Sequence, residues 1–473
     1  MRTRLGLFCD KVIEAGWLAA VIVVPLFFNI YSQRVFEPDK LSILRSIALV
    51  MSAAWLVRVA EDWRAGRERP ESRVSLRQRV FNTPMVLPTL LLVVVYLLST
   101  VLSVDWQVSL MGSYQRLQGT YTTLSYIVIF FLMLDGLRTN RQLNRLAMVP
   151  VLVSFPIAMY GLVQHFGLDP LPWGGDVTTR VASNMGNAIF VAAFLILTVP
   201  LTLSRLFENW RGAVGPFDSR DAILGVAAFL LLAAALLVGM FVRRGEDVAW
   251  IRWVALAVGV GLQVPIYLLS SPERRPRVLA ISLPLTFAFL VAFSWILEIF
   301  FPPAQGSDAS RYFWLGILAA VVFVLAMAAF AAYLRKPISR PLLLASYFVI
   351  LISQIIAIFY AQSRGPLLGL LGGVFVYFIL LGVTNRRLWL SWLAAGLAIA
   401  LGAFLIMFNT VQSPLIETLR ETPYVGRLGR VLQTEEGTGR VRVLIWEGVT
   451  DMLAWHEPIE FPGDDGGPDG LNA

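Results

Sequence analysis

Long apolar runs separated by short polar connections repeat along most of this chain. Windows of about 19 residues identify about thirteen runs, each long enough to cross a hydrocarbon core of about 30 Å as a helix. None of them alternates apolar and polar residues as a barrel strand does. The pattern therefore predicts an all-α, polytopic transmembrane helix bundle with about 12–13 spans in this sequence. The predicted spans lie near residues 12–33, 40–60, 84–104, 120–137, 146–166, 184–206, 221–242, 250–270, 278–301, 312–334, 341–361, 366–383 and 388–409.

Basic residues gather in every second connection between these spans. The even-numbered connections contain, among others, Arg58, Arg64, Arg138, Arg145, Arg205, Arg274, Arg335 and Arg386. The odd-numbered connections are poorer in positive charge. The positive-inside rule therefore places the N-terminus and the even connections in the cytoplasm. Arg243 and Arg244 are an exception, because they fall in an odd-numbered connection.

The composition agrees with a membrane protein. Hydrophobic residues make up 57% of the 473 residues and charged residues only 15%, whereas soluble domains are about 45–50% apolar and about 25% charged. The net charge of +8 comes largely from arginine in the connections, so nucleic acid is not an expected partner. One cysteine and two histidines leave little from which to build a metal site. We expect neither a metal nor a cofactor.

The first predicted span resembles the start of a secretory signal peptide. It follows Arg2, Arg4 and Lys11, but its apolar stretch runs on through Phe27 to Ile30 without a small-residue cleavage site. We therefore expect a retained signal-anchor rather than a removable leader.

Two regions follow from the positions of the spans. Residues 1–409 form the predicted transmembrane domain, and residues 410–473 the start of a large extracytoplasmic loop. One face of a helix in this loop is predicted by the spacing of Val441, Leu444, Ile445 and Val449. Residues 460–473 have the Gly, Pro and Asp composition of turns. We expect the sequence to be a fragment that stops inside the loop.

Arg364 carries a full positive charge between two apolar runs, at residues 342–361 and 366–383. A guanidinium costs about 2.5–3.5 kcal/mol at the centre of a span, so Arg364 is expected at a membrane face or in a polar cavity. Its planar fork of donors suits a phosphate or pyrophosphate. The alternative is an arginine at a helix end whose charge reaches the interface by snorkelling.

Four arginines stand near span ends on the predicted outer face, where positive charge is scarce. They are Arg116, Arg180, Arg364 and Arg440. Such a group suits a lipid-linked pyrophosphate, whose negative charge must be held while it leaves. The alternative is interface anchoring, or ordinary salt bridges to Asp105, Asp169, Asp176 or Glu447.

Several short stretches, taken in order, resemble the O-antigen ligase and O-antigen polymerase superfamily of bacterial envelope glycosyltransferases. They cover most of the chain from about Gly112 onward. The stretches are Tyr160 to Pro170, Arg180 with Gly186 and Asn187, the turn Ser363-Arg364-Gly365, and Gly439-Arg440 followed by Trp446, Glu457 and Pro458.

This resemblance implies a GT-C-like ligase architecture in the bacterial inner membrane. The activity it implies is metal-independent, inverting transfer of a glycan from an undecaprenyl-pyrophosphate carrier. The acceptor would be a hydroxyl of a glycan, lipid or protein at the outer face. By the same resemblance Arg364 and Arg440 are the catalytic pair that engages the pyrophosphate. Substrate-binding roles are expected for Arg116, Arg180, Ser363 and Gly365.

The catalytic histidine of that superfamily lies further along the outer loop. Its position would fall beyond Ala473, and His456 precedes it. We therefore do not assign His456 as the general base.

Two other classes stay open. A transporter or flippase of lipid-linked or small anionic solutes would also use arginines, along a path open to both faces. Span centres almost free of Asp, Glu and Lys disfavour ion-coupled transport. A non-catalytic protein of envelope assembly is the third possibility.

The topology predicts that single cysteines at Thr434 or Thr438 face the outside. In a variant without Cys9, a membrane-impermeant maleimide should label them in intact spheroplasts. Labelling only after lysis would contradict both the topology and the transferase hypothesis.

Overall fold

The computed structural model describes residues 3–29, 36–64, 85–214, 339–384, 388–411 and 437–454, together with positions 31, 81–83, 278, 282, 386 and 413. The chain divides into two units, Met1–Leu367 and Leu368–Ala473. Apart from positions 278 and 282, the four predicted spans between residues 221 and 334 lie outside the described residues, and so do Arg243, Arg244 and His456.

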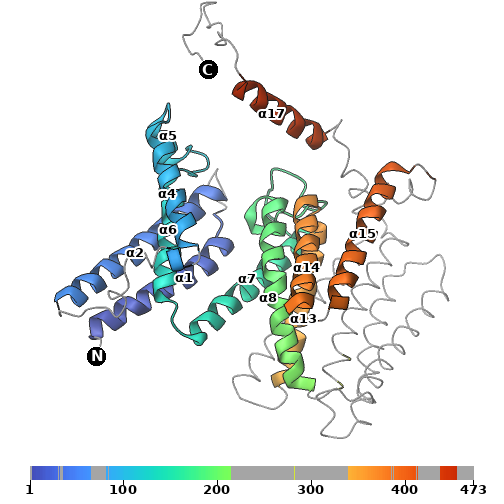
Figure 1. Cartoon of the computed structure of the whole chain (residues 1–473), viewed down its shortest axis with the longest axis horizontal. Coiled ribbons are helices and arrows are strands. Elements are labelled where there is room, and N and C mark those ends of the chain that lie inside the picture. The colour runs from blue at the N-terminus through green and yellow to red at the C-terminus, as the bar shows by residue number, and fades with distance from the viewer. Residues whose placement is uncertain are drawn as a thin grey trace, which may run out of the picture. The chain divides into compact units, whose positions relative to one another are not determined.

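Every regular element in the described part of the chain is a helix (Figure 1). The first unit contains α1 (Arg4–Leu26), α2 (Glu37–Arg64), α4 (Val86–Val101), α5 (Trp106–Met111), α6 (Thr120–Gly136), α7 (Asn140–His165), the short 3-10 helix η2 (Ser183–Met185), α8 (Ala188–Val214) and α13 (Ser339–Tyr360). The helix α14 (Arg364–Thr384) begins at the end of this unit. The second unit also contains α15 (Leu388–Thr410) and α17 (Gly437–Leu453). The predicted all-α class is therefore confirmed for the described residues.

Within the described ranges, six helices are long and apolar enough to cross a membrane. They are Glu37–Arg64, Asn140–His165, Ala188–Asn209, Leu343–Tyr360, Arg364–Thr384 and Ser391–Thr410. The helices α4 and α6 are apolar as well, but have only 16 and 17 residues.

Side-chain packing joins α1, α2 and α6. Trp17 and Met51 are almost completely buried in a cluster with Ile13 and Leu132. A Cβ atom at Gly16 would lie 2.3 Å from the Met51 side chain, so a small residue allows this close approach of α1 and α2.

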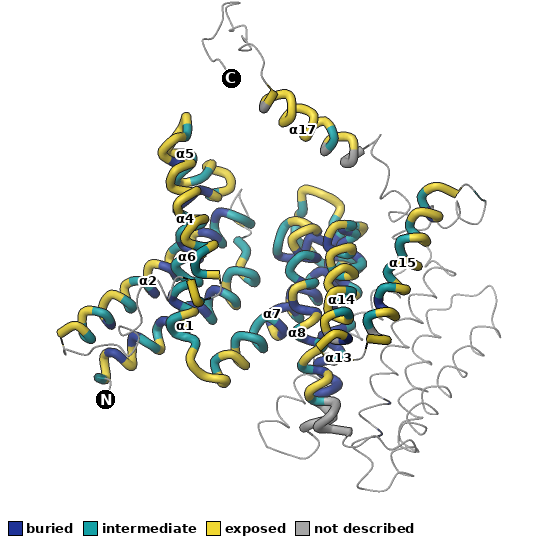
Figure 2. The backbone as a smooth tube through the Cα atoms, in the orientation of Figure 1, coloured by how far each residue is buried: buried dark blue, intermediate teal, exposed yellow. Residues whose placement is uncertain are grey.

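The helix α4 exposes most of its side chains (Figure 2), as expected of an apolar helix that faces lipid.

A buried amide joins α7, α8 and α13. Gln354 of α13 is 0% exposed, and its Nε2 lies 2.6 Å from Ser154 Oγ of α7 and 2.9 Å from Thr202 Oγ1 of α8. Each of these hydroxyls donates to a carbonyl of its own helix. The hydroxyls therefore accept from the amide, which holds three helices together where no water competes.

The first span ends earlier than predicted. Helix α1 stops at Leu26, and Phe27 is already extended. The carbonyls left open at this end accept hydrogen bonds from distant side chains. Asn184 Nδ2 lies 2.6 Å from the Pro25 oxygen, and Lys40 Nζ lies 3.4 Å from the same atom. These donors satisfy the end of the helix, so the apolar residues 27–29 need not continue it.

Arg58 also differs from its prediction. It lies inside α2, not in the following connection, and its side chain is only 6% exposed. The guanidinium forms ion pairs with Asp10 of α1, at 2.8 Å, and with Asp135 of α6. Two carboxylates make burial of this charge tolerable. Nearby at this end of the bundle, Arg145 pairs with Glu14 at 2.6 Å.

The buried charge triad predicts a large difference between two neighbouring arginines. Replacing Arg58 with alanine leaves Asp10 and Asp135 without their shared cation, and should destabilise the fold by about 3 kcal/mol. Arg138 pairs with the same Asp135 at 3.5 Å, but its side chain is 44% exposed. Arg138→Ala should therefore cost at most about 1 kcal/mol. Unfolding of both variants in detergent micelles measures the difference, and equal losses would contradict the role assigned to Arg58.

Candidate functional site

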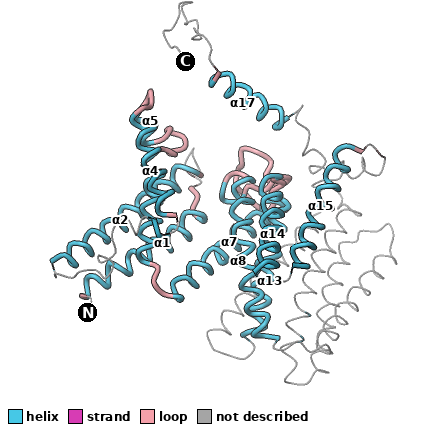
Figure 3. The backbone as a smooth tube through the Cα atoms, viewed as in Figure 1, coloured by secondary structure: helices cyan, strands magenta, loops and turns pink. Residues whose placement is uncertain are grey.

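The connection between α7 and α8, residues 166–187, is held by two polar side chains from the stretch Tyr160–Pro170. Asp169 Oδ2 accepts hydrogen bonds from the Tyr160 hydroxyl, at 2.8 Å, and from Trp173 Nε1, at 2.7 Å. Asp169 Oδ1 accepts from the backbone of Leu171 at 3.1 Å. This carboxylate therefore fixes the beginning of the connection. Figure 3 shows the connection as a long loop that joins the ends of α7 and α8.

Gln164 fixes the far end of the same connection. Its side chain is completely buried, and its Oε1 accepts from the backbone N–H of Ser183, at 2.6 Å, and of Ala182, at 3.2 Å. Ser183 has a φ of +48°, a backbone conformation that residues other than glycine rarely adopt. The Ser183 hydroxyl also donates to the Ile157 oxygen at 2.8 Å. Hydrogen bonds to buried partners thus stabilise a strained turn.

Between these anchors, residues 178–181 lie against the end of α13. Val181 donates its N–H to the Tyr360 oxygen at 3.3 Å, and Arg180 Nε donates to the Ala361 oxygen at 3.3 Å. In the other direction Gln362 Nε2 donates to the Thr179 oxygen at 2.8 Å. The structure therefore brings Arg180 to the turn that carries Arg364.

His165 supports this contact from α7. Its ring stacks on Tyr360 with 3.6 Å between ring centroids, and its Nδ1 lies 2.6 Å from the Thr178 oxygen. Both interactions are structural, since they fix the segment before Arg180 against the end of α13.

Arg364 is the first residue of α14, and its side chain is half-buried. No acidic residue lies in the first turn of this helix. The N-terminus of a helix carries partial positive charge, so a cation there is unfavourable and an anion is favourable. The preceding Ser363 is buried, and a side chain at Gly365 would meet no atom within 4 Å. Among the described residues, there is consequently open space beside Gly365 at a helix end that favours an anion.

The loop that carries Arg116 is shaped by two glycines, Gly112 and Gly119, and by Arg45. Gly112 has a φ of +86°, and a Cβ there would lie 2.3 Å from the backbone of Gln118. From α2, Arg45 donates to the oxygens of Met111, at 2.8 Å, and Leu117, at 2.7 Å. The charge of Arg45 is thereby satisfied by carbonyls of this loop.

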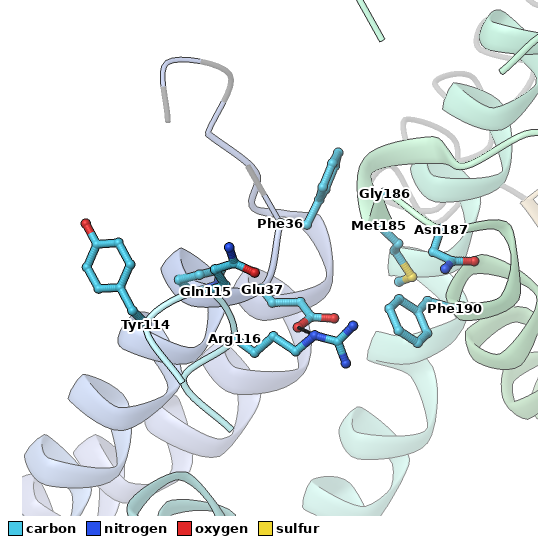
Figure 4. Close-up of a pocket in the computed structure, with 10 residues that line it drawn as sticks. Phe36, Glu37, Tyr114, Gln115, Arg116, Met185, Gly186, Asn187 and Phe190 are labelled. Atoms are coloured by element: carbon cyan, nitrogen blue, oxygen red, sulfur yellow. Dashed lines mark ion pairs between the residues drawn. The ribbon is translucent and has the colours of Figure 1, made fainter. Parts of the chain in front are cut away.

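Arg116 opens onto a pocket of about 550 Å³. Its Nε lies 4.0 Å from Glu37 Oε2, and its side chain is 71% exposed. In Figure 4 this pair faces Met185, Asn187 and Phe190, which come from the start of α8 and the residues before it. The remaining lining residues are Phe36, Pro38, Tyr114, Gln115 and Gly186. The pocket thus combines aromatic rings with charged and amide groups, the composition typical of a small-molecule site.

Phe36 links this pocket to the connection that holds Arg180. Its ring stacks on Trp173 with 5.5 Å between centroids, and a Cβ at Gly186 would lie 2.2 Å from the same ring. Gly186 has a φ of +72°, so this position favours glycine for two reasons. Arg116, Arg180 and Arg364 therefore stand at one end of the first unit. The ion pairs of Arg58 and Arg145 stand at the other.

Arg440 lies in the second unit, near the start of α17, and is exposed. The predicted amphipathic helix is confirmed here, because α17 spans Gly437–Leu453. Among the described residues, no group of three His, Cys, Asp or Glu side chains could hold a metal ion.

Three polar residues at this end of the first unit have roles that were not predicted from the sequence. Arg45, Lys40 and Asn184 hold loops and helix ends together by donating to carbonyl oxygens. Lys40 and Arg45 did carry a signal, because a charge inside an apolar run is costly unless it has a partner. Asn184 carried none.

Asp176 lies in the same connection but forms only a local turn. Hydrogen bonds from the side chains and backbone of Thr178 and Thr179 hold the pKa of Asp176 well below its usual range. The carboxylate is therefore ionised at neutral pH, and its contribution to the turn is lost only in strong acid.

No family model, curated protein or solved structure matches this chain. The helices and the site define a class nevertheless. The chain is a multi-pass helical membrane protein, and in its first unit Arg180 bonds the turn that precedes Arg364. Membership of the O-antigen ligase superfamily is a proposal.

The two aspartates of the 166–187 connection give a matched test of the site. Asp169→Asn replaces one carboxylate oxygen with an NH₂ group. Either the half-buried donors of Tyr160 and Trp173 or the N–H of Leu171 then loses its acceptor, at a cost of about 1–3 kcal/mol. Backbone amides of residues 178–183 should then exchange with deuterium at least about tenfold faster. Asp176→Asn, at an exposed turn of the same connection, should leave their exchange unchanged. Similar exchange in both variants would show that Asp169 does not hold the loop.

Proposed function

We propose that this protein is a membrane glycosyltransferase of the O-antigen ligase or polymerase type. It transfers a glycan from an undecaprenyl-pyrophosphate carrier to an acceptor hydroxyl at the outer face of a bacterial inner membrane. The observation that carries the proposal is the hydrogen bond between Arg180 Nε and the Ala361 oxygen, which brings a second arginine to the Arg364 turn.

The pyrophosphate of the carrier occupies the space beside Arg364. Arg364, at the N-terminus of α14, binds phosphate oxygens, and Arg180 adds a second cation. Arg440 is the other member of the catalytic pair by the superfamily resemblance alone. During the reaction the acceptor oxygen bonds to the anomeric carbon and the bond to the pyrophosphate oxygen breaks. The leaving pyrophosphate takes the electron pair, and the arginines stabilise its charge.

The proton of the acceptor hydroxyl passes to a general base, which is a histidine in the superfamily that the chain resembles. The pocket beside Arg116 offers sugar rings the aromatic ring of Phe190, together with the polar groups of Glu37 and Asn187. We assign the carbohydrate next to the pyrophosphate to this pocket. Arg116, through its pairing with Glu37, orients a saccharide rather than holding the leaving group.

The proposed orientation has the N-terminus in the cytoplasm. It rests on the positive-inside rule and agrees with the positions of the charged residues at the two ends of the first unit. Arg58, Arg138, Arg145 and Arg205 form ion pairs around one end. The candidate site occupies the other end, which then faces the outside.

The proposal predicts that Arg364 and Arg440 act as a unit. The test is transfer from an undecaprenyl-pyrophosphate glycan to an acceptor in proteoliposomes, using the full-length protein. Arg364→Ala and Arg440→Ala should each lower the rate by about 10²–10³. The double variant should be scarcely slower than the poorer single variant, because both side chains stabilise the same charge. Arg386→Ala, an exposed arginine between α14 and α15, is the control and should transfer normally.

Three outcomes would contradict this proposal. Independent, multiplicative losses would mean that the two arginines do not share a ligand. Normal transfer by Arg364→Lys, which keeps the charge but loses the bidentate fork, would mean that Arg364 only anchors the helix end at the interface. Passage of the lipid-linked glycan between leaflets, without transfer to acceptor, would favour the flippase alternative.

A further inference from the structure

Helix α17 exposes nearly all of its large apolar side chains. The exposed fractions are 55% for Val441, 58% for Ile445 and 72% for Met452. Figure 2 shows exposed residues along most of the helix. Soluble surfaces rarely present apolar side chains in such a continuous row, and a row of this kind marks an interaction surface.

The apolar residues of α17 share one face. Val441, Ile445, Val449 and Met452 recur at intervals of three or four residues, with Leu444 beside them. The opposite face carries Arg440, Glu447, Thr450 and Asp451, whereas Arg442 falls at the edge of the apolar row by its position in the helix. The helix is therefore amphipathic. A spanning helix, in contrast, is apolar on all sides.

This helix does not suit a membrane crossing. It has 17 residues, whereas a span needs about 20 that are predominantly apolar. It also carries charged residues in both its first and its last turns. By contrast α15, the preceding described helix, contains a candidate span that ends at Thr410. Only residues 411–436 separate that span from Gly437, so α17 is tethered close to the bilayer surface, where even weak affinity for lipid is sufficient.

We propose that α17 lies in the plane of the bilayer surface, with phospholipid as its partner. Its apolar face enters the boundary between headgroups and acyl chains, as amphipathic interfacial helices do. Trp446, at the edge of this face and 69% exposed, occupies the interface that tryptophan prefers. Arg440, on the polar side near the start of the helix, reaches the phosphate layer from above.

This arrangement places Arg440 at the depth where the phosphates of a lipid-linked donor lie. That consequence alone rests on the proposed transferase function. The interfacial position itself depends only on the faces of α17 and on its tether to α15.

Nitroxide scanning of the full chain tests the proposal. The chain carries Cys9→Ser and one spin-labelled cysteine, in vesicles of phosphatidylethanolamine and phosphatidylglycerol. Labels replacing Val441 or Ile445 should collide more with oxygen than with a water-soluble nickel complex, at a depth of about 5–10 Å. Labels replacing Glu447 or Thr450, on the polar face of the same helix, should show the reverse. A label at Leu397 of α15, which is 63% exposed within a candidate span, gives the reference for lipid.

Each other outcome overturns the inference. Nickel accessibility at Ile445 equal to that at Glu447 would place α17 in water. Low accessibility to both reagents at Ile445 would mean that protein covers the face. Spin–spin broadening there would identify a second copy of this chain as the cover. Because the measurement needs no substrate, a failed transfer assay leaves the inference intact, and a failed depth measurement leaves the proposed function intact.

Discussion

The carboxamide of Gln164 holds the part of the structure on which the candidate site depends. Its oxygen accepts from the backbone of Ala182 and Ser183, and its nitrogen lies 3.4 Å from Asp169. One buried group therefore closes both ends of the connection between α7 and α8. Without water to replace these hydrogen bonds, opening the loop would leave several polar groups unsatisfied. Arg180 takes its place against α13 because this loop is closed.

The same constraint explains how the bundle carries charge. Arg58 is buried between two carboxylates, and Arg45 is satisfied by carbonyls of the Arg116 loop. Gln354 uses its amide in the same way on three hydroxyl-bearing positions. In each case a polar side chain from one helix bonds to polar groups of other segments. These bonds offset the cost of burying the side chain and fix the positions of the helices. These residues stabilise the scaffold, which leaves the ligand role to arginines nearer the surface.

The candidate site combines two features that favour an anion. Arg364 stands at a helix N-terminus without an acidic neighbour in the first turn, and Arg180 is bound to the carbonyl three residues earlier. The nearby pocket has an aromatic and polar lining instead. A pyrophosphate joined to a sugar contains both kinds of surface in one molecule. The division between charge-binding and ring-binding regions is the physical reason for preferring a glycosyl donor over a simple anion.

The sequence by itself determined where the helices lie. The nine predicted spans within the described residues all correspond to helices, and the face of α17 was visible in its spacing, because length and periodicity are local properties. It also identified the arginines. Only the tertiary structure decided what they contact. Arg58 lies in α2, not in the predicted connection, and forms a buried triad with two carboxylates. Arg116 faces Glu37. Arg180 bonds a residue 181 positions away. Such pairings depend on how distant helices pack and which loops they bring together, and no local pattern encodes that geometry.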